Sequence, residues 1–241
     1  MPEPLQGLDR IAAAVRGSVE PYATLVRELA GANAKSLAFF GAVVAGSFDL
    51  QRHSARSVLV LEAVDLGLLR RLAERGVKLG KSHISAPLIM TPSYILASCD
   101  TFALELIEIQ QQHVTVFGED FFANLSFEDS HVRLQCEREL KVALIGLRQG
   151  LLAAAGRESA LAPVVDQVIE NMTRTLRGLL WLKGQKEEKP AKDVIADVEK
   201  MCNRELSGLA EALNRTAATT WLAFENLYRD VEAMKKFVDA K

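Results

Sequence analysis

The sequence has few cysteines and histidines, and none of them is grouped as a protein metal site requires. The three cysteines, at positions 99, 136 and 202, are far apart and form no Cys-x-x-Cys pair. The four histidines are separated in the chain by 30, 30 and 18 residues. These spacings exclude a local zinc-binding motif and favour reduced, mostly buried thiols.

The sequence also lacks long apolar runs and an excess of charge of either sign. No uninterrupted apolar segment approaches the roughly 20 residues of a transmembrane helix, and the opening residues MPEPLQGLDR do not resemble a signal peptide. Lysine and arginine number 29 against 31 acidic residues, for a formal net charge of -2. This balance gives no general attraction to nucleic acid or to an anionic membrane. We therefore expect a cytoplasmic protein that binds neither.

Two common enzyme motifs are absent as well. The sequence contains no Gly-x-Ser-x-Gly turn, and Gly80-Lys81 lacks the upstream glycine of a phosphate-binding P-loop. What the chain does have is a composition typical of globular proteins, with 49% hydrophobic and 25% charged residues over 241 positions. This length is enough for one large or two modest domains.

The segment Ser36 to Leu61 has the pattern of a strand, a glycine-marked turn, a polar loop and a second strand. The apolar run Leu37 to Phe40 ends at Gly41, and Gly46 follows among small residues. Because glycine has no side chain and tolerates positive φ, the backbone can approach a ligand closely there. The unbroken run Val58 to Leu61 predicts a strand that is buried on both faces.

This order of residues resembles the start of the nucleotidyltransferase superfamily that has the minimal DNA polymerase beta-like fold. The resemblance implies that a Gly-Ser pair and a later glycine hold nucleotide phosphates, and that an Asp-x-Asp on the next strand binds two magnesium ions. On this sequence the Gly-Ser pair falls on Gly41 and Ala42, and the later glycine falls on Gly46. The two aspartates fall on Ser54 and Arg56.

The loss of both aspartates argues against magnesium-dependent transfer and leaves no cofactor to expect. A serine and an arginine in their place shift the local formal charge by three units toward positive and remove the anionic ligands. Arg56 can instead act as a fixed countercharge, since a guanidinium pairs bidentately with phosphate; the alternative is a solvated arginine at a loop edge. The candidate nucleotide- or phosphate-binding residues are Gly41, Ala42, Gly46, Ser47, Ser54 and Arg56.

The remainder of residues 1–128 completes an α+β domain with a small mixed sheet. Because Pro21 interrupts the helical spacing, a kinked helix or two short helices are expected over residues 8–29. A further helix is expected over 66–75, a strand over 84–90 and a last strand near 114–117. Segment 100–112, which is similar to one in bacterial members of the same group, predicts a helix with Glu105 and Glu108 three residues apart. These two acids either bind a metal together or form the solvated edge of the helix. Asp49 and Asp65 are further acids that could replace the missing pair.

Residues 129–241 are predicted to form an all-α helical bundle, and this part of the chain also resembles the group's helical domain. Helical periodicity is present from 129, over 161–182, 194–201 and 205–240, with a polar connection at 183–193. The apolar positions of the last helix favour association with a protein partner or with a second copy.

Three hypotheses follow for the function. The first is a catalytically degenerate nucleotidyltransferase-like protein that binds a nucleotide or a protein without transferring a nucleotide. The second is an active transferase that moves a nucleoside monophosphate onto a small-molecule or protein hydroxyl with non-standard acids. The third is an interaction protein or subunit that uses its helical bundle and does not bind nucleotides.

Overall fold

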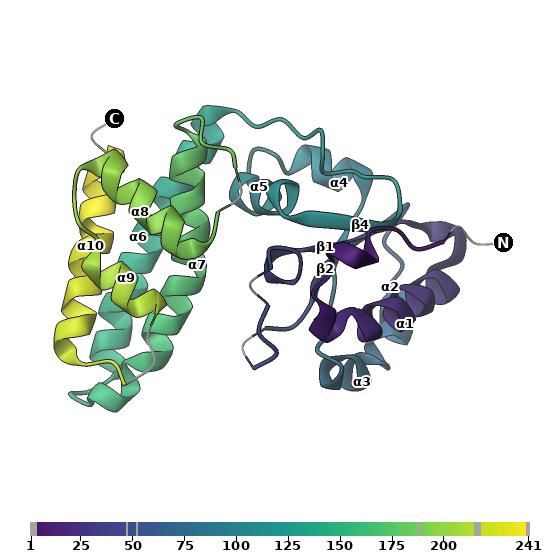
Figure 1. Cartoon of the computed structure of the whole chain (residues 1–241), viewed down its shortest axis with the longest axis horizontal. Helices are drawn as coiled ribbons and strands as arrows, with labels where there is room; N and C mark the ends of the chain where they lie inside the picture. Colours follow the sequence, from purple (N-terminus) through teal and green to yellow (C-terminus); the bar gives the residue numbers. More distant parts are fainter. Residues whose placement is uncertain (1–3, 47, 52, 188, 215–217, 240–241) are drawn as a thin grey trace. The chain divides into compact units, whose positions relative to one another are not determined.

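The computed structural model describes residues 4–46, 48–51, 53–187, 189–214 and 218–239 (Figure 1). The chain packs into two compact units. The first is Met1–Cys99 with Leu106–Ser126, and the second is Asp100–Glu105 with Phe127–Lys241. The predicted division into two domains, with a boundary between residues 128 and 129, stays a prediction.

The first unit contains a four-stranded mixed sheet, so the predicted α+β class is confirmed. The strands are β1 (Ala34–Phe40), β2 (Arg56–Leu61), β3 (Leu88–Met90) and β4 (His113–Gly118), and their order in the sheet is β3-β2-β1-β4. The central strand β1 is antiparallel to both β2 and β4, whereas β2 and β3 are parallel. The helices of this unit are α1 (Ala13–Ala30), α2 (Leu66–Ala73), α3 (Gly76–Lys81), α4 (Pro92–Ala97) and most of α5 (Ala103–Gln111).

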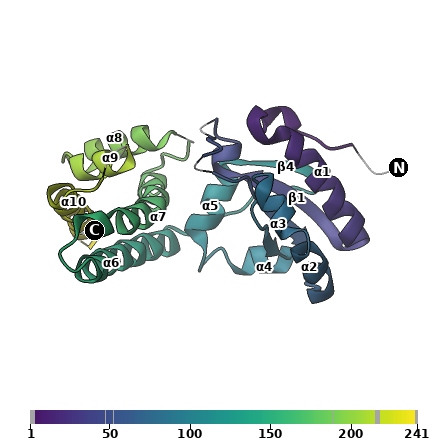
Figure 2. The ribbon, with the colours of Figure 1, turned by 90° about the horizontal axis from the view of Figure 1, so that it is seen from below.

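The two faces of the sheet are covered by different helices (Figures 1 and 2). On one face, Leu37, Phe39 and Leu59 join a single apolar core with Val15, Val19 and other residues of α1 and α2. Burial of these apolar side chains stabilises the unit. The other face carries Phe40 and lies toward α5. Side chains alternate between the faces along each strand, so consecutive residues of β1 serve different layers.

Pro21 does not divide the first helix, so of the two predicted alternatives the pair of short helices separated by Pro21 is wrong. Residues Leu8–Arg10 form a short 3-10 helix, and α1 then runs without a break from Ala13 to Ala30 with Pro21 inside it. A proline removes the hydrogen bond to the carbonyl four residues earlier, which here belongs to Gly17. Both Gly17 and Pro21 are exposed, so water can satisfy that carbonyl and the helix continues.

The two edges of the sheet are protected in different ways. The edge strand β3 is only three residues long and follows Pro87 directly, and both features limit pairing with other strands. At the opposite edge, the amide of Gln6 donates a hydrogen bond of 2.8 Å to the carbonyl of Val116 in β4. Part of the outer side of β4 is therefore occupied by the N-terminal segment.

The second unit is helical, but its last predicted helix is divided. Its helices are α6 (Asp129–Ala153), α7 (Ala162–Trp181), α8 (Ala191–Cys202), α9 (Ser207–Leu213) and α10 (Trp221–Asp239). The single helix predicted over 205–240 is wrong, because described residues 218–220 are not helical; residues 215–217 and Ala240 lie outside the described residues. Thr220 explains the new start, since its hydroxyl accepts a hydrogen bond from the amide of Ala223.

Buried polar side chains join the helices of the second unit. The carboxylate of Asp230 in α10 accepts a hydrogen bond of 3.0 Å from the amide of Leu209 near the start of α9. Gln135 of α6 accepts one of 2.9 Å from the amide of Leu104. Each contact satisfies a backbone donor near a helix start that would otherwise be unpaired. Within the described part of the chain, no helix has both the length and the hydropathy needed to cross a membrane.

Candidate functional site

Gly41 forces the chain to turn at the end of β1. Its φ of +73° is a left-handed conformation that other residues adopt at a cost. Its amide donates to the carbonyl of Gln112 at 2.9 Å, and its own carbonyl accepts from the amides of Val44 and Ala45 at 2.8 and 3.0 Å. The predicted turn is therefore tied to the start of β4 and held closed by its own backbone.

The strand register places three large side chains in one row beside this turn. Phe40, the last residue of β1, is paired with Arg56 at the start of β2 and with His113 at the start of β4. Residues directly opposite one another in antiparallel strands project from the same face. Arg56, Phe40 and His113 consequently share the face of the sheet that lies toward α5.

Arg56 is held in place by two contacts. Its guanidinium carbon lies 4.4 Å from the centroid of the Phe40 ring, a distance at which a cation and an aromatic face attract. Its Nη1 donates to Oε1 of Glu108 at 3.4 Å, with 41% of the Arg56 side chain and 11% of the Glu108 side chain exposed. Arg56 is thus neither a fully solvated arginine nor a buried one.

Of the six residues predicted to bind phosphate, the structure brings Gly41 and Arg56 together. A β-carbon added at Gly41 would lie 3.9 Å from Nη1 of Arg56 and 3.8 Å from Oε1 of Glu108. Ala42 is half-buried in the short 3-10 helix Gly41–Val43. Gly46, with φ of +73°, has open space around its α-carbon, and Ser54 is exposed just before β2. Ser47 lies outside the described residues.

The acids that could replace the missing aspartates make contacts elsewhere. Asp65 caps α2, accepting a hydrogen bond of 2.8 Å from the amide of Gly67, and it follows the far end of β2. Asp49 accepts from the amide of Gln51 at 2.9 Å within its own loop. Glu105 accepts from Nη1 of Arg174 at 2.9 Å, whereas Glu108 contacts Arg56. Glu105 and Glu108 therefore each contact a different arginine, and the shared metal-binding alternative stays without support.

This set of side chains does not suit a pair of magnesium ions. Mg²⁺ is usually held by one or more carboxylates together with water and substrate phosphates. Beside the turn, the carboxylate of Glu108 already faces the permanent positive charge of Arg56.

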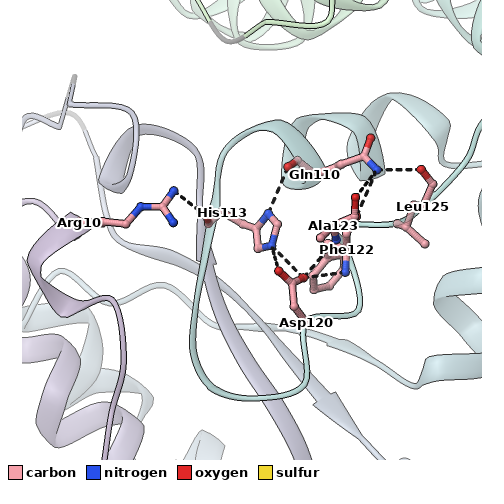
Figure 3. Close-up of polar contacts among 7 residues, drawn as sticks. All are labelled: Arg10, Gln110, His113, Asp120, Phe122, Ala123 and Leu125. Atoms are coloured by element: carbon pink, nitrogen blue, oxygen red, sulfur yellow. Dashed lines mark hydrogen bonds and ion pairs between the residues drawn. The ribbon is translucent and has the colours of Figure 1, made fainter.

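The third side chain of the row, His113, belongs to a separate polar cluster (Figure 3). Its Nε2 lies 2.9 and 3.0 Å from the two carboxylate oxygens of Asp120, and its Nδ1 lies 3.2 Å from the carbonyl of Gln110. Both ring nitrogens therefore lie within hydrogen-bond distance of an oxygen atom. Asp120 also accepts from the amides of Phe122 and Ala123 at 3.0 and 3.1 Å.

This cluster fixes the segment that follows β4. The amide nitrogen of the Gln110 side chain lies 3.2, 3.3 and 2.8 Å from the carbonyls of Phe122, Ala123 and Leu125. Partial burial acts to raise the pKa of Asp120, but the hydrogen bonds from Phe122, His113 and Ala123 and the attraction to His113 outweigh it and lower the pKa. A lowered pKa means that the charged carboxylate stabilises the folded segment.

Sequence reasoning missed most of these partners. Glu108 is 52 residues from Arg56 in the chain, and only the position of α5 against the sheet brings the two together. His113 and Asp120, at opposite ends of the short strand β4, are seven positions apart in the sequence. A histidine at the start of a short strand and an aspartate just after its end is the signal that could have indicated this contact.

The fold of the chain is nucleotidyltransferase-like. One solved structure with this fold is spectinomycin adenyltransferase AAD(9) from Enterococcus faecialis, determined with ATP and spectinomycin. The match covers 92% of this chain and 98% of that chain, with a TM-score of 0.58 and 9% sequence identity. No family model and no curated protein matches the sequence. The similarity therefore establishes the fold alone.

Proposed function

We propose that this chain is a nucleotide-binding protein with a nucleotidyltransferase-like fold that does not carry out magnesium-dependent transfer. The observation that carries the proposal is the position of Arg56 beside Gly41, where relatives of this fold are expected to hold metal ions with carboxylates. Support for a nucleotide ligand comes from the similar adenyltransferase, whose structure contains ATP.

The surroundings of Arg56 suit a phosphate group. The guanidinium has five N–H donors in a planar fork that matches phosphate oxygens, and 41% of the side chain is exposed to an incoming ligand. Contact with Phe40 fixes the plane of the guanidinium, so less conformational entropy is lost when an anion binds. The glycine at position 41 keeps side-chain atoms out of the space beside Nη1.

Calorimetric titration with ATP, GTP, CTP and UTP, each with EDTA and with magnesium, tests this proposal. We expect binding in EDTA that magnesium does not strengthen, because Arg56 supplies the countercharge. The R56Q variant should bind about tenfold to a hundredfold more weakly, as expected for a lost charge-assisted hydrogen bond to phosphate. R70Q is the matched control, since Arg70 is an exposed arginine of the same unit on α2.

Two results would contradict the proposal. If none of the four nucleotides binds, the proposal of a nucleotide ligand is wrong. The hypothesis of protein association through the helical bundle would then be tested by measuring the mass of the protein in solution. Release of pyrophosphate that requires magnesium would instead favour the alternative hypothesis, an active transferase that moves a nucleoside monophosphate onto a hydroxyl. Variants D49N and E105Q would then identify the acids responsible.

A further inference from the structure

Arg56 already has an anionic neighbour in the folded chain. Its Nη1 lies 3.4 Å from Oε1 of Glu108, and no other described residue accepts a hydrogen bond from its guanidinium. Four of the five N–H donors are thus left for another acceptor. Because Phe40 contacts the face of the guanidinium, a further anion must bind along its edge, either beside Glu108 or in its place at Nη1.

The contact between the two charges is a loose one. A strong charge-assisted N–H···O hydrogen bond is about 2.7 to 2.9 Å long, which is shorter than the 3.4 Å found here. The partners are also unequally exposed, since Glu108 is 11% exposed and Arg56 is 41% exposed. A carboxylate on a helix and largely buried cannot move far into solvent, so it stays near any ligand that reaches Arg56.

Gly41 places no side-chain atom in the space beside the two charges. A β-carbon at this position would be almost equidistant from the two, 3.8 Å from Oε1 of Glu108 and 3.9 Å from Nη1 of Arg56. A phosphate that approaches Arg56 over Gly41 therefore also approaches a carboxylate within a few ångströms. At that separation like charges repel appreciably even where solvent screens them.

We infer that Glu108 is a built-in competitor for the anion site at Arg56, so that its carboxylate weakens nucleotide binding by an autoinhibitory contact. This inference rests on the proposed function, because it concerns the strength of binding at the same site. A phosphate must displace the Glu108 carboxylate from the guanidinium or bind beside it against its charge. Either route lowers the affinity of the wild-type chain.

The E108Q variant tests the inference directly. Glutamine keeps the size of the side chain and removes its charge, so ATP in EDTA should bind about fivefold to tenfold more tightly than to the wild-type chain. Inorganic tripolyphosphate should show the same gain, because the competition concerns phosphate and not the base. E105Q is the matched control: it removes one carboxylate from the same helix, but that carboxylate contacts Arg174, so affinity should not change.

The outcomes separate this inference from the proposed function. Wild-type binding that E108Q does not strengthen, or an equal gain in E105Q, overturns the competition while leaving nucleotide binding in place. No binding by either chain overturns both. The gain must also disappear in the double variant R56Q/E108Q, since the carboxylate acts through Arg56.

A measurement on the unaltered chain covers the case in which E108Q fails to fold. We expect ATP to shift the carboxyl carbon resonance of Glu108 in the wild-type protein as its contact with Arg56 changes. An unchanged Glu108 resonance at saturating ATP would overturn the inference.

Discussion

Replacing Asp120 with asparagine tests whether the polar cluster around His113 stabilises the first unit. In the folded chain the carboxylate receives hydrogen bonds from the amides of Phe122 and Ala123 and lies 2.9 Å from Nε2 of His113 (Figure 3). Asparagine has one carbonyl oxygen and no charge, so it keeps at most part of this set. The change alters little volume, and its effect should report on charge and hydrogen bonding.

The expected loss is moderate, because 41% of the Asp120 side chain is exposed. A hydrogen bond to a charged group contributes roughly 1.5 to 3 kcal/mol, and solvent screening reduces the sum of these contacts. We therefore expect D120N to lower the free energy of unfolding by about 1 to 2 kcal/mol at pH 6.

The dependence on pH has a definite sign. The folded pKa of Asp120 is lowered from its value of 3.8 in the unfolded chain, so the unfolded state takes up the proton first as the pH falls. The stabilisation by the carboxylate is present above about pH 4 and is lost as the pH drops through the folded pKa. The difference between the wild type and D120N should therefore shrink as the pH falls from about 4 to 3.

Urea unfolding across this pH range measures the difference, and hydrogen exchange at the amides of Phe122 and Ala123 locates it. Exchange at these two amides should accelerate in D120N. E119Q is the matched control, because it removes the charge of the neighbouring exposed acid and should change neither quantity. Equal stabilities of wild type and D120N at pH 6, or a difference that persists unchanged at pH 3, would refute the reasoning.

Two further predictions concern packing. G118A should cost at least about 3 kcal/mol of stability, because Gly118 has φ of +80° and a β-carbon there would overlap the carbonyl of Lys35. The control variant G46A, with φ of +73° and open space around position 46, should cost only about 1 kcal/mol. Losses of similar size for the two variants in urea unfolding would contradict this account. Cys136 should resist a thiol reagent until the second unit unfolds, because burial raises its pKa to about 12; labelling of Cys136 as fast as that of Cys202 in the folded chain would show the burial to be wrong.

The strands could be predicted because their apolar runs are continuous. Residues 37–40 and 58–61 lie within β1 and β2. Short, continuous apolar runs of this kind are typical of buried strands. The helices were harder to delimit. The last one was predicted as a single element because its apolar positions repeat past residue 214, whereas its division depends on a local hydrogen bond of Thr220.

The candidate site could be predicted only where it depends on residues that are neighbours in the sequence. Gly41 was recognised from its position at the end of an apolar run, and its positive φ agrees with the predicted turn. The contacts of Arg56 depend on strand register and on the placement of α5, neither of which is encoded in residue spacing near Arg56. The phosphate-binding roles of Ala42, Gly46 and Ser54 stay predictions.

The hydrogen bond between Gln6 and Val116 has a practical consequence for handling the protein. An exposed edge strand can pair with strands of neighbouring molecules, which is how many sheets form fibrils. Deletion of the first seven residues, or fusion of a bulky tag near them, would expose backbone hydrogen-bonding groups of β4 and promote aggregation. A tag at the other terminus would leave this edge covered.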